Sequence, residues 1–279
     1  MIALLTCENL EGFVHDEHLL EQALKGRNLS YEWVEWKSEV NWNKYQLAIV
    51  RTTWDYFENS QLFFDQLKKI EESSCKLINP YSMMKWNSHK TYLRELSEHG
   101  FATVPTFFSC KFSVEELDSA LDKLEGDKFV FKPTIGAGAK DTFLLSKTDS
   151  MEELKVLEGR EVMVQPFVEE IANGEYSLHF FAGEFSHAIL KKPKPGDYRS
   201  QEEYGSHIDK VDPPSGMLAT SQSILKSLEE PTLYARVDFA VQQDKHLLME
   251  LELIEPSMYF RFDENSAPMM VDKLIKNYL

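Results

Sequence analysis

Two stretches, ARVDF at positions 235–239 and MELELIEP at positions 249–256, decide how the rest of this chain is interpreted. Both alternate apolar and charged residues, as β-strands with two different faces do. Glu250 and Glu252 are two positions apart, so they share a face, and a short polar turn would place Asp238 beside them in a hairpin. Unpaired carboxylates buried on one face repel each other, and a divalent cation relieves the repulsion. Oxygen ligands favour Mg²⁺ or Mn²⁺ over Zn²⁺. A solvated polar face is the alternative that the pattern leaves open.

Cations gather upstream of this hairpin. Lys132 ends an apolar strand, and the loop after it contains Gly136 and Gly138, so a cation and free backbone N–H groups meet at one place. That combination suits phosphate, although the loop matches neither a P-loop nor a dinucleotide fingerprint. Residues 189–199 add four cations in eleven positions, Lys191 and Arg199 among them. A flexible hairpin and a solvated basic loop are the respective alternatives.

Composition excludes several classes of protein. The 279 residues include 46 Asp and Glu against 30 Lys and Arg, a formal net charge of −16. Such a surface argues against coating nucleic acid or an anionic membrane, yet it leaves room for a locally basic pocket. The three cysteines are scattered without a CxxC pair, which argues against a disulfide framework or a thiolate zinc site. With no long apolar run and no basic leader, we expect a soluble, cytoplasmic protein.

The order of strand and helix signals predicts a small α/β domain followed by a larger α+β region that splits near residue 165. Alternating strands and helices over residues 1–84 favour a parallel sheet, in which ligands bind beyond the carboxyl ends of the strands. The segment Arg51-Thr52-Thr53-Trp54-Asp55-Tyr56, after the third strand, is therefore a candidate substrate loop; a surface loop anchored by Trp54 is the alternative. We also expect an N-cap at Ser60, a linker over Pro80–Asn87 and a helix over Ser88–His99.

Taken in order, the motifs resemble the ATP-grasp superfamily, and most of all its glutathione-synthetase-like branch, which includes the ATP-grasp enzyme of cycloserine biosynthesis. The likeness covers most of the chain. Besides residues 51–56, it runs through Asn87–Lys90, Lys132-Pro133, Gln165–Val168, Gly174–Ser177, Gly196–Arg199, Arg236–Asp238, and Glu250–Glu252 with Pro256. The resemblance implies an ATP-grasp fold with an N-terminal Rossmann-like domain. Residues 1–84 would form the substrate-side domain, 85–165 the central subdomain with the phosphate-binding loop, and 166–279 the C-terminal subdomain with the metal site.

The resemblance also implies roles for single residues in a nucleotide and metal site. Lys90 and Lys132 would bind the ATP phosphates, and the loop from Gly136 through Gly138 to Thr142 would close over them. The adenosine and its surroundings would be held by Gln165, Pro166, Phe167, Val168, Glu175 and Lys191. Two Mg²⁺ ions, for which Mn²⁺ could substitute, would be held by Asp238, Glu250 and Glu252. Glu255 is out of phase with the pair of glutamates and is the expected bystander.

For the substrates, the resemblance implies a second group of residues. Arg199, together with Lys132, would act in catalysis by stabilising the transferred phosphoryl group or the substrate carboxylate. An amino-acid-like substrate would contact Arg51, Trp54, Asp55, Tyr56 and, as a clamp on a carboxylate, Arg261. Many relatives have Asn where this chain has Glu252, and a carboxylate at that place still binds Mg²⁺.

The expected function is an ATP-dependent ligase. Phosphorylation turns a substrate carboxylate into an acyl phosphate, and an amine displaces the phosphate to form a C–N bond, with ADP and phosphate as products. Both an intermolecular reaction and a ring closure within one substrate are open, as is attack by a thiol. The partners would be small carboxylates and amines, with no nucleic acid and no membrane, in a chain that could form a homodimer. A non-catalytic nucleotide-binding module that acts through a protein partner is the alternative.

Overall fold

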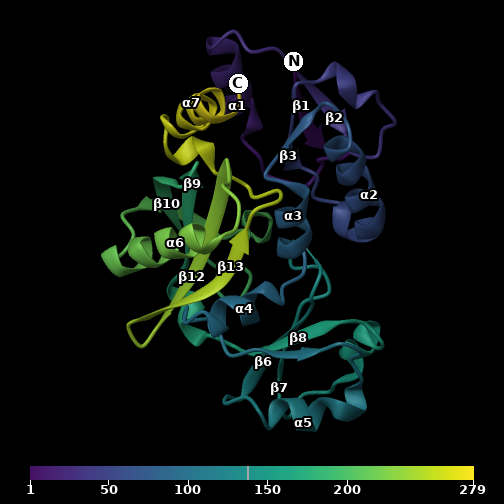
Figure 1. The fold of residues 1–279 in the computed structure, drawn as a ribbon. Helices are drawn as coiled ribbons and strands as arrows, with labels where there is room; N and C mark the ends of the chain where they lie inside the picture. The colour runs from purple at the N-terminus through teal and green to yellow at the C-terminus, as the bar shows by residue number, and fades with distance from the viewer. Residues whose placement is uncertain (137) are drawn as a thin grey trace.

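The computed structural model describes residues 1–136 and 138–279 (Figure 1). Ala137, in the loop expected to close over the triphosphate, lies outside the described residues. Within these ranges the strands form three sheets, with the orders β2-β1-β3-β4, β5-β8-β6-β7 and β11-β10-β9-β12-β13. We call them the N-terminal, middle and C-terminal sheets. In Figure 1 the middle sheet lies below the other two, which stand side by side.

The N-terminal sheet is parallel, as the alternation of strand and helix signals predicts. Its strands are Ile2–Thr6 (β1), Tyr31–Glu35 (β2), Leu47–Thr52 (β3) and Lys76–Ile78 (β4). Helix α2 (Ser60–Glu71) packs on the face that carries Leu5, and helix α1 (Glu17–Gly26) packs on the face that carries Leu4. Because β3 is buried along its whole length, the loop after it begins from a fixed point at the carboxyl edge of the sheet.

The middle sheet is antiparallel and separates an apolar face from a face with polar side chains. Its strands are Phe107–Ser109 (β5), Lys128–Pro133 (β6), Phe143–Ser146 (β7) and Val162–Pro166 (β8). Phe129 and Phe131 alternate into a core shared with helix α5 (Leu117–Leu121). Val130 and Lys132 therefore point to the other face of the sheet.

The C-terminal sheet is also antiparallel, and it carries the predicted hairpin. Its strands are Glu175–Phe181 (β9), Glu184–Lys192 (β10), His207–Val211 (β11), Tyr234–Gln242 (β12) and Lys245–Glu252 (β13). Alternate residues such as Val237 and Leu251 form a core with helices α6 (Ser215–Ser227) and α4 (Tyr92–Glu98). The prediction of the hairpin is confirmed, with Asp238 opposite Glu250 in the ladder. The carboxylates thus lie on the face turned away from α6.

A C-terminal helix and several short 3₁₀ helices complete the fold. Helix α7 (Ser266–Tyr278) packs against α1 and closes the core on the side of the N-terminal sheet that α1 covers. Short 3₁₀ helices occupy Trp42–Lys44, Tyr56–Asn59, Val114–Glu116, Glu152–Leu157, Glu169–Asn173, Glu202–Tyr204 and Phe260–Phe262. As for membranes, none of the helices in the described residues combines the length and apolar character that crossing one requires.

Three local predictions were wrong. The expected linker Pro80–Asn87 is helix α3 (Tyr81–Asn87), which buries Met83 and Met84 and begins after a proline, a residue that helix starts tolerate. The helix expected from Ser88 begins only at Tyr92. The N-cap of α2 is Asn59, whose side chain accepts a hydrogen bond from the backbone of Leu62, and not Ser60.

Candidate active site

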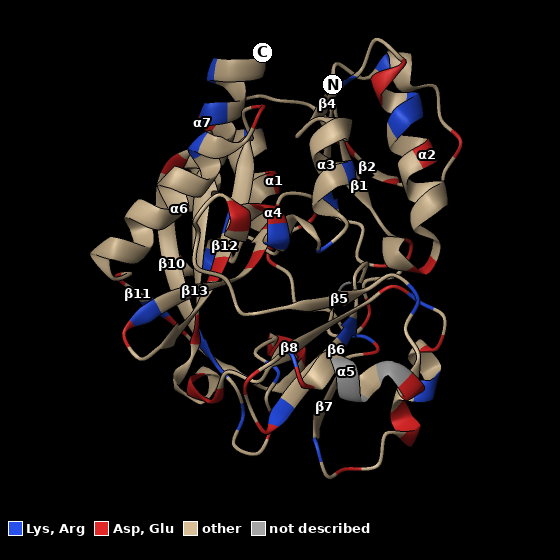
Figure 2. Cartoon of the chain, turned by 60° about the horizontal axis from the view of Figure 1, so that its bottom comes forward, with Lys and Arg blue, Asp and Glu red and all other residues tan. Residues whose placement is uncertain are grey.

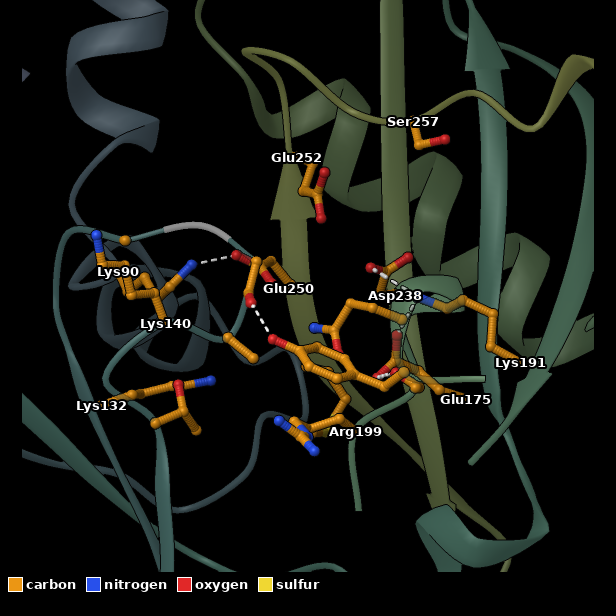
Figure 3. A pocket seen from close by; sticks show the side chains of 18 of the residues that line it. Lys90, Lys132, Lys140, Glu175, Lys191, Arg199, Asp238, Glu250, Glu252 and Ser257 are labelled. Atoms are coloured by element: carbon orange, nitrogen blue, oxygen red, sulfur yellow. Dashed lines mark hydrogen bonds and ion pairs between the residues drawn. The ribbon is translucent and has the colours of Figure 1, made fainter. Parts of the chain in front are cut away.

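A cavity of about 640 Å³ lies between the middle and C-terminal sheets and reaches the loop after β3 (Figure 3). Its volume falls in the range of small-molecule sites, roughly 300–1,000 Å³. Acidic and basic residues are spread over loops and helices in all parts of the chain (Figure 2). Several charged side chains that line the cavity are nevertheless buried, among them Glu175, Lys191, Arg236 and Asp238. Buried charge costs stability unless it is paired, so this concentration marks the cavity as a functional site.

Two lysines form the cationic wall of the cavity. Lys90 lies between α3 and α4, where its backbone N–H donates to the carbonyl of Thr134 at 2.8 Å, and its ammonium pairs with Glu250. Lys132 projects from β6 toward the same space (Figure 3). Burial and the nearby charge of Lys90 lower the pKa of Lys132 to about 8. An anion between the two ammonium groups would offset their repulsion, so this wall suits phosphate.

The hairpin β12–β13 forms the acidic wall. The guanidinium of Arg236 donates to Asp238, with an Nη2–Oδ2 distance of 2.8 Å, and also pairs with Glu252. Burial alone would raise the pKa of Asp238, but the charges of Arg236 and Lys191 hold it below its usual value. Burial raises the pKa of Glu252 to about 7 against the opposing charge of Arg236. The carboxylates of this wall are therefore only partly neutralised.

The donor chemistry of this wall fits a hard divalent cation. Asp238, Glu250, Glu252 and Glu255 line one cavity and offer only oxygen atoms, which Mg²⁺ prefers. Burial and Glu252 also raise the pKa of Glu255 to about 8, which again indicates excess negative charge. In the described part of the chain, no three His, Cys, Asp or Glu side chains lie close enough together to hold a metal ion. Binding an ion would thus require Glu250 and Glu252 to exchange their present partners, Lys90 and Arg236.

The predicted nucleotide residues lie in the same cavity. Gln165, Pro166, Phe167 and Val168 line it at the end of β8, and Gly136 and Gly138 line it beside Lys132. Glu175, at the start of β9, pairs with the ammonium of Lys191 and accepts a hydrogen bond from the hydroxyl of Ser200 at 3.0 Å. The structure thus brings together every residue that the sequence suggested for phosphate, nucleoside and metal.

Arg199 borders the cavity, but its charge is balanced locally (Figure 3). Its Nε and Nη2 atoms donate to Asp197 at 2.9 and 2.7 Å, and its guanidinium carbon lies 3.7 Å from the centre of the Tyr204 ring. The hydroxyl of Tyr204 donates to the carbonyl of Gly138 at 3.1 Å, and Tyr198 donates to that of Thr142 at 3.0 Å. The segment with Arg199 is therefore tied to the loop expected to cover phosphate.

The substrate-side predictions divide into two groups. Trp54 and Tyr56 line the cavity, and the indole N–H of Trp54 donates to the carbonyl of Glu255 at 2.9 Å. The structure places the other three predicted residues elsewhere, each among partners of its own. Arg51 is fully buried against Glu17, Asp55 binds Trp36 and Lys37, and Arg261 pairs with Asp16 and Glu202.

Other residues line the cavity without having been singled out from the sequence. Arg236 could have been found, because it lies two positions before Asp238 and so shares its face. Glu255, expected to be a bystander, also lines the cavity, because it follows the end of β13, where strand alternation no longer applies. Phe13 packs against Trp54 with ring centres 5.1 Å apart and planes tilted by 50°. It lies in a loop, where no periodic pattern in the sequence could have indicated it.

Residues 2–79 match a family model described as the N-terminal domain of the D-cycloserine synthetase DcsG. Over 275 residues the chain is 29% identical to the cycloserine biosynthesis protein DcsG of Streptomyces lavendulae, covering 91% of this chain and 90% of that protein. A crystal structure of D-cycloserine synthetase DcsG superposes with a TM-score of 0.88 at 24% identity, covering 100% and 99% of the two chains.

A second solved structure carries the name of the fold. It is the ATP-grasp ligase PsnB, complexed with a variant of its minimal precursor, Mg and ADP, and it superposes with a TM-score of 0.68 at 14% identity, covering 100% of this chain and 98% of that one. The family resemblance expected from the sequence motifs is confirmed. The chain therefore has an ATP-grasp fold and is similar over nearly its whole length to DcsG.

Proposed function

We propose that this protein is an ATP-dependent ligase that joins a carboxylate to an amine and releases ADP and phosphate. The observation that carries the proposal is the cavity itself, in which Lys90 and Lys132 face the carboxylates of Asp238, Glu250 and Glu252. Cations suited to phosphate and oxygen ligands suited to Mg²⁺ are the parts that phosphoryl transfer needs. The names of the relatives, a cycloserine biosynthesis protein and an ATP-grasp ligase with Mg and ADP, support the same assignment.

In this proposal the three parts of the chain have different tasks. Residues 1–84 form the substrate side, residues 85–165 hold the phosphates, and residues 166–279 hold the nucleoside and the metal. Asp238, Glu250 and Glu252 would bind two Mg²⁺ ions, which offset the negative charge of the triphosphate when bound, and Mn²⁺ could use the same oxygen ligands. Lys90 and Lys132 would fix the phosphates from the opposite wall.

The reaction would proceed through an acyl phosphate. A carboxylate is a poor electrophile, so its oxygen first takes the γ-phosphoryl group of ATP, and the amine then attacks the activated carbonyl and expels phosphate. Arg236 and Arg199 border the place where negative charge develops, and cations fixed there stabilise the transition state. Tyr198 and Tyr204 hold the loop at Gly138–Thr142 over the site, which would keep water away from the intermediate.

The substrate side favours a small, amino-acid-like molecule. Trp54, Tyr56 and Phe13 give it an aromatic wall, while Glu203 brings a carboxylate to the same opening. An apolar body with an ammonium group would fit this combination, since aromatic faces and carboxylates both attract cations. Intermolecular joining and ring closure within one substrate both agree with it.

The test is a trapping experiment. The protein is incubated with Mg·ATP, hydroxylamine and, one at a time, amino acids, hydroxy acids and small peptides. The expected result is ADP release that depends on one class of substrate, together with a hydroxamate formed from the acyl phosphate. Tight ATP binding without ADP release from any member of a broad panel would contradict the enzyme. That outcome would favour a nucleotide-binding module that acts through a protein partner.

A further inference from the structure

The loop at Gly138–Thr142 carries one lysine, Lys140, between two anchored ends. Tyr204 donates a hydrogen bond to the carbonyl at one end of the loop at 3.1 Å, and Tyr198 donates to the carbonyl at the other end at 3.0 Å. Both chain neighbours of Lys140 have positive φ angles, 56° and 53°, in the left-handed region that residues other than glycine seldom adopt. The backbone around Lys140 therefore has a defined conformation, which sets where its side chain leaves the loop.

The ammonium of Lys140 lies where this loop meets the substrate side. Its Nζ is 5.0 Å from the centre of the Phe57 ring and 3.4 Å from Oε1 of Glu58. Both partners belong to the 3₁₀ helix Tyr56–Asn59, which continues directly from the candidate substrate loop. Phe57 and Lys140 also line the cavity, and Figure 3 shows Lys140 on the side of the cationic wall, across from Asp238. Lys140 thus stands at the junction between the proposed phosphate and substrate regions.

The ion pair of Lys140 with Glu58 can be exchanged at little cost. The two side chains are 54% and 56% exposed, and within the described residues Lys140 has no second ion pair. Exposed pairs of this kind contribute little to stability. Arg199 and Arg236 also line the cavity, but each donates two hydrogen bonds to an aspartate two positions away in the chain. Of these three cations, Lys140 is the one most readily available to a new anionic partner.

The substrate carboxylate needs a cation at this junction. Its oxygen must approach the γ-phosphate of ATP, and the two negative charges repel each other unless a positive charge lies beside them. Arg51 and Arg261, which the sequence suggested for this task, are held by carboxylates that do not line the cavity. The phosphate loop contributes a cation that the two arginines do not.

We propose that Lys140 leaves Glu58 and binds the carboxylate of the substrate, holding one of its oxygens toward the γ-phosphorus of ATP. Resting on the proposed function, this assigns the residue that positions the phosphoryl acceptor. The carboxylate oxygen forms its bond to phosphorus as the bond to the leaving ADP oxygen breaks, and no proton moves in that step. Glu58 competes with the substrate for the same ammonium group.

Kinetics and nucleotide titrations test the role of Lys140. The carboxylate used is the member of the panel that gives a hydroxamate with the wild type, and it is varied at saturating Mg·ATP. Lys140→Met should raise its KM by about 10- to 100-fold, the range for losing a hydrogen bond between charged groups. The Kd of Mg·ATP, titrated without the carboxylate, should stay the same. A weaker Kd for Mg·ATP with an unchanged KM for the carboxylate would overturn the proposal, because Lys140 would then bind the triphosphate.

Glu58→Gln tests the competition, because it should have the opposite effect. Without its counterion Lys140 is free for the substrate, and KM for the carboxylate should fall by about 2- to 5-fold, the value of an exposed ion pair. A higher or unchanged KM would overturn the competition. Should Lys140→Met fail to fold, as judged by circular dichroism, Glu58→Gln still decides.

Lys128 supplies the matched control. It also pairs with an exposed glutamate, Glu169, at 3.0 Å, but it does not line the cavity. Lys128→Met should therefore leave both constants at their wild-type values, and a rise in KM equal to that of Lys140→Met would overturn the assignment. A wild type that turns over, together with a Lys140→Met variant of unchanged KM, refutes only this inference. A wild type that forms neither ADP nor hydroxamate with any member of the panel refutes the proposed function, and this inference with it.

Discussion

Arg51 and Glu17 form an ion pair that is buried on both sides and joins strand β3 to the start of helix α1. The guanidinium donates twice, from Nη2 to Oε1 at 2.6 Å and from Nε to Oε2 at 3.1 Å, and Nη2 also reaches the carbonyl of Pro256 at 3.2 Å. Arg51 is 0% exposed. The pair therefore links the N-terminal sheet to the segment that follows the acidic hairpin, and it explains why Arg51 does not reach the cavity.

Removing one member of this pair should destabilise the protein strongly. Arg51→Met leaves the Glu17 carboxylate buried without its cation, and such losses cost about 3–5 kcal/mol in free energy of unfolding. Urea denaturation followed by circular dichroism measures the effect. The double variant with Glu17→Gln should recover part of the loss, since the uncompensated charge is then gone. A loss below about 1 kcal/mol in Arg51→Met would contradict the structural role.

Lys132 should make ATP binding sensitive to pH. Burial and the charge of Lys90 lower its pKa to about 8, so the ammonium form that attracts phosphate is lost as the pH rises through 8. Affinity for ATP should be constant near pH 7 and fall by up to about tenfold per pH unit above 8. Titrations between pH 7 and 9.5 measure this. The Lys132→Gln variant should bind ATP more weakly at pH 7 and lose most of the pH dependence of ATP affinity. If the variant keeps the pH profile of the wild type, the titrating group is not Lys132.

The sequence pattern found the carboxylate wall because the strand period is fixed by backbone geometry. Glu250 and Glu252 had to share a face once β13 was recognised, and the hairpin then placed Asp238 opposite Glu250. Lys132 was found in the same way, as the last charged residue of an apolar strand. Residues whose position follows from a period and a turn can be predicted without knowledge of the rest of the fold.

The wrong and incomplete predictions share a different origin. Arg261 looked like a substrate clamp, but Asp16 and Glu202, far away in the sequence, occupy its guanidinium. Helix α3 looked like a linker because a helix of only seven residues gives little periodicity. It is fixed by Asn87, whose amide donates to the carbonyl of Leu251 at 2.8 Å. Contacts with residues that are distant in the sequence cannot be predicted from the local sequence pattern.

Glu250→Gln should abolish turnover while the protein stays folded. The change keeps the size of the side chain but removes a charge that faces Lys90 and would bind Mg²⁺. We expect the rate of ADP formation to fall by at least about 100-fold, comparable to the loss of a group that stabilises the transition state. Affinity for Mn²⁺, followed by paramagnetic resonance, should fall as well. The exposed Glu229→Gln is the matched control and should match the wild type; near-normal activity in Glu250→Gln would contradict the metal assignment.

His187 and His179 should make the protein less stable in mild acid. Their rings stack with centres 4.3 Å apart and planes 5° apart, and within the described residues the Nε2 atom of each is buried without a partner. Burial, reinforced by Lys210 and opposed by Asp263, lowers the pKa of His187 to about 4. In the unfolded chain the pKa of a histidine is near 6.5, so between pH 6.5 and 4 the unfolded chain binds more protons than the folded protein, and stability falls as the pH drops.

Between pH 7 and 5, protonation of His187 alone should lower the free energy of unfolding, measured by urea denaturation, by about 2 kcal/mol. His187→Phe keeps a stacked ring without titrating nitrogens and should lose correspondingly less, so equal losses in the two proteins would contradict the role of this imidazole.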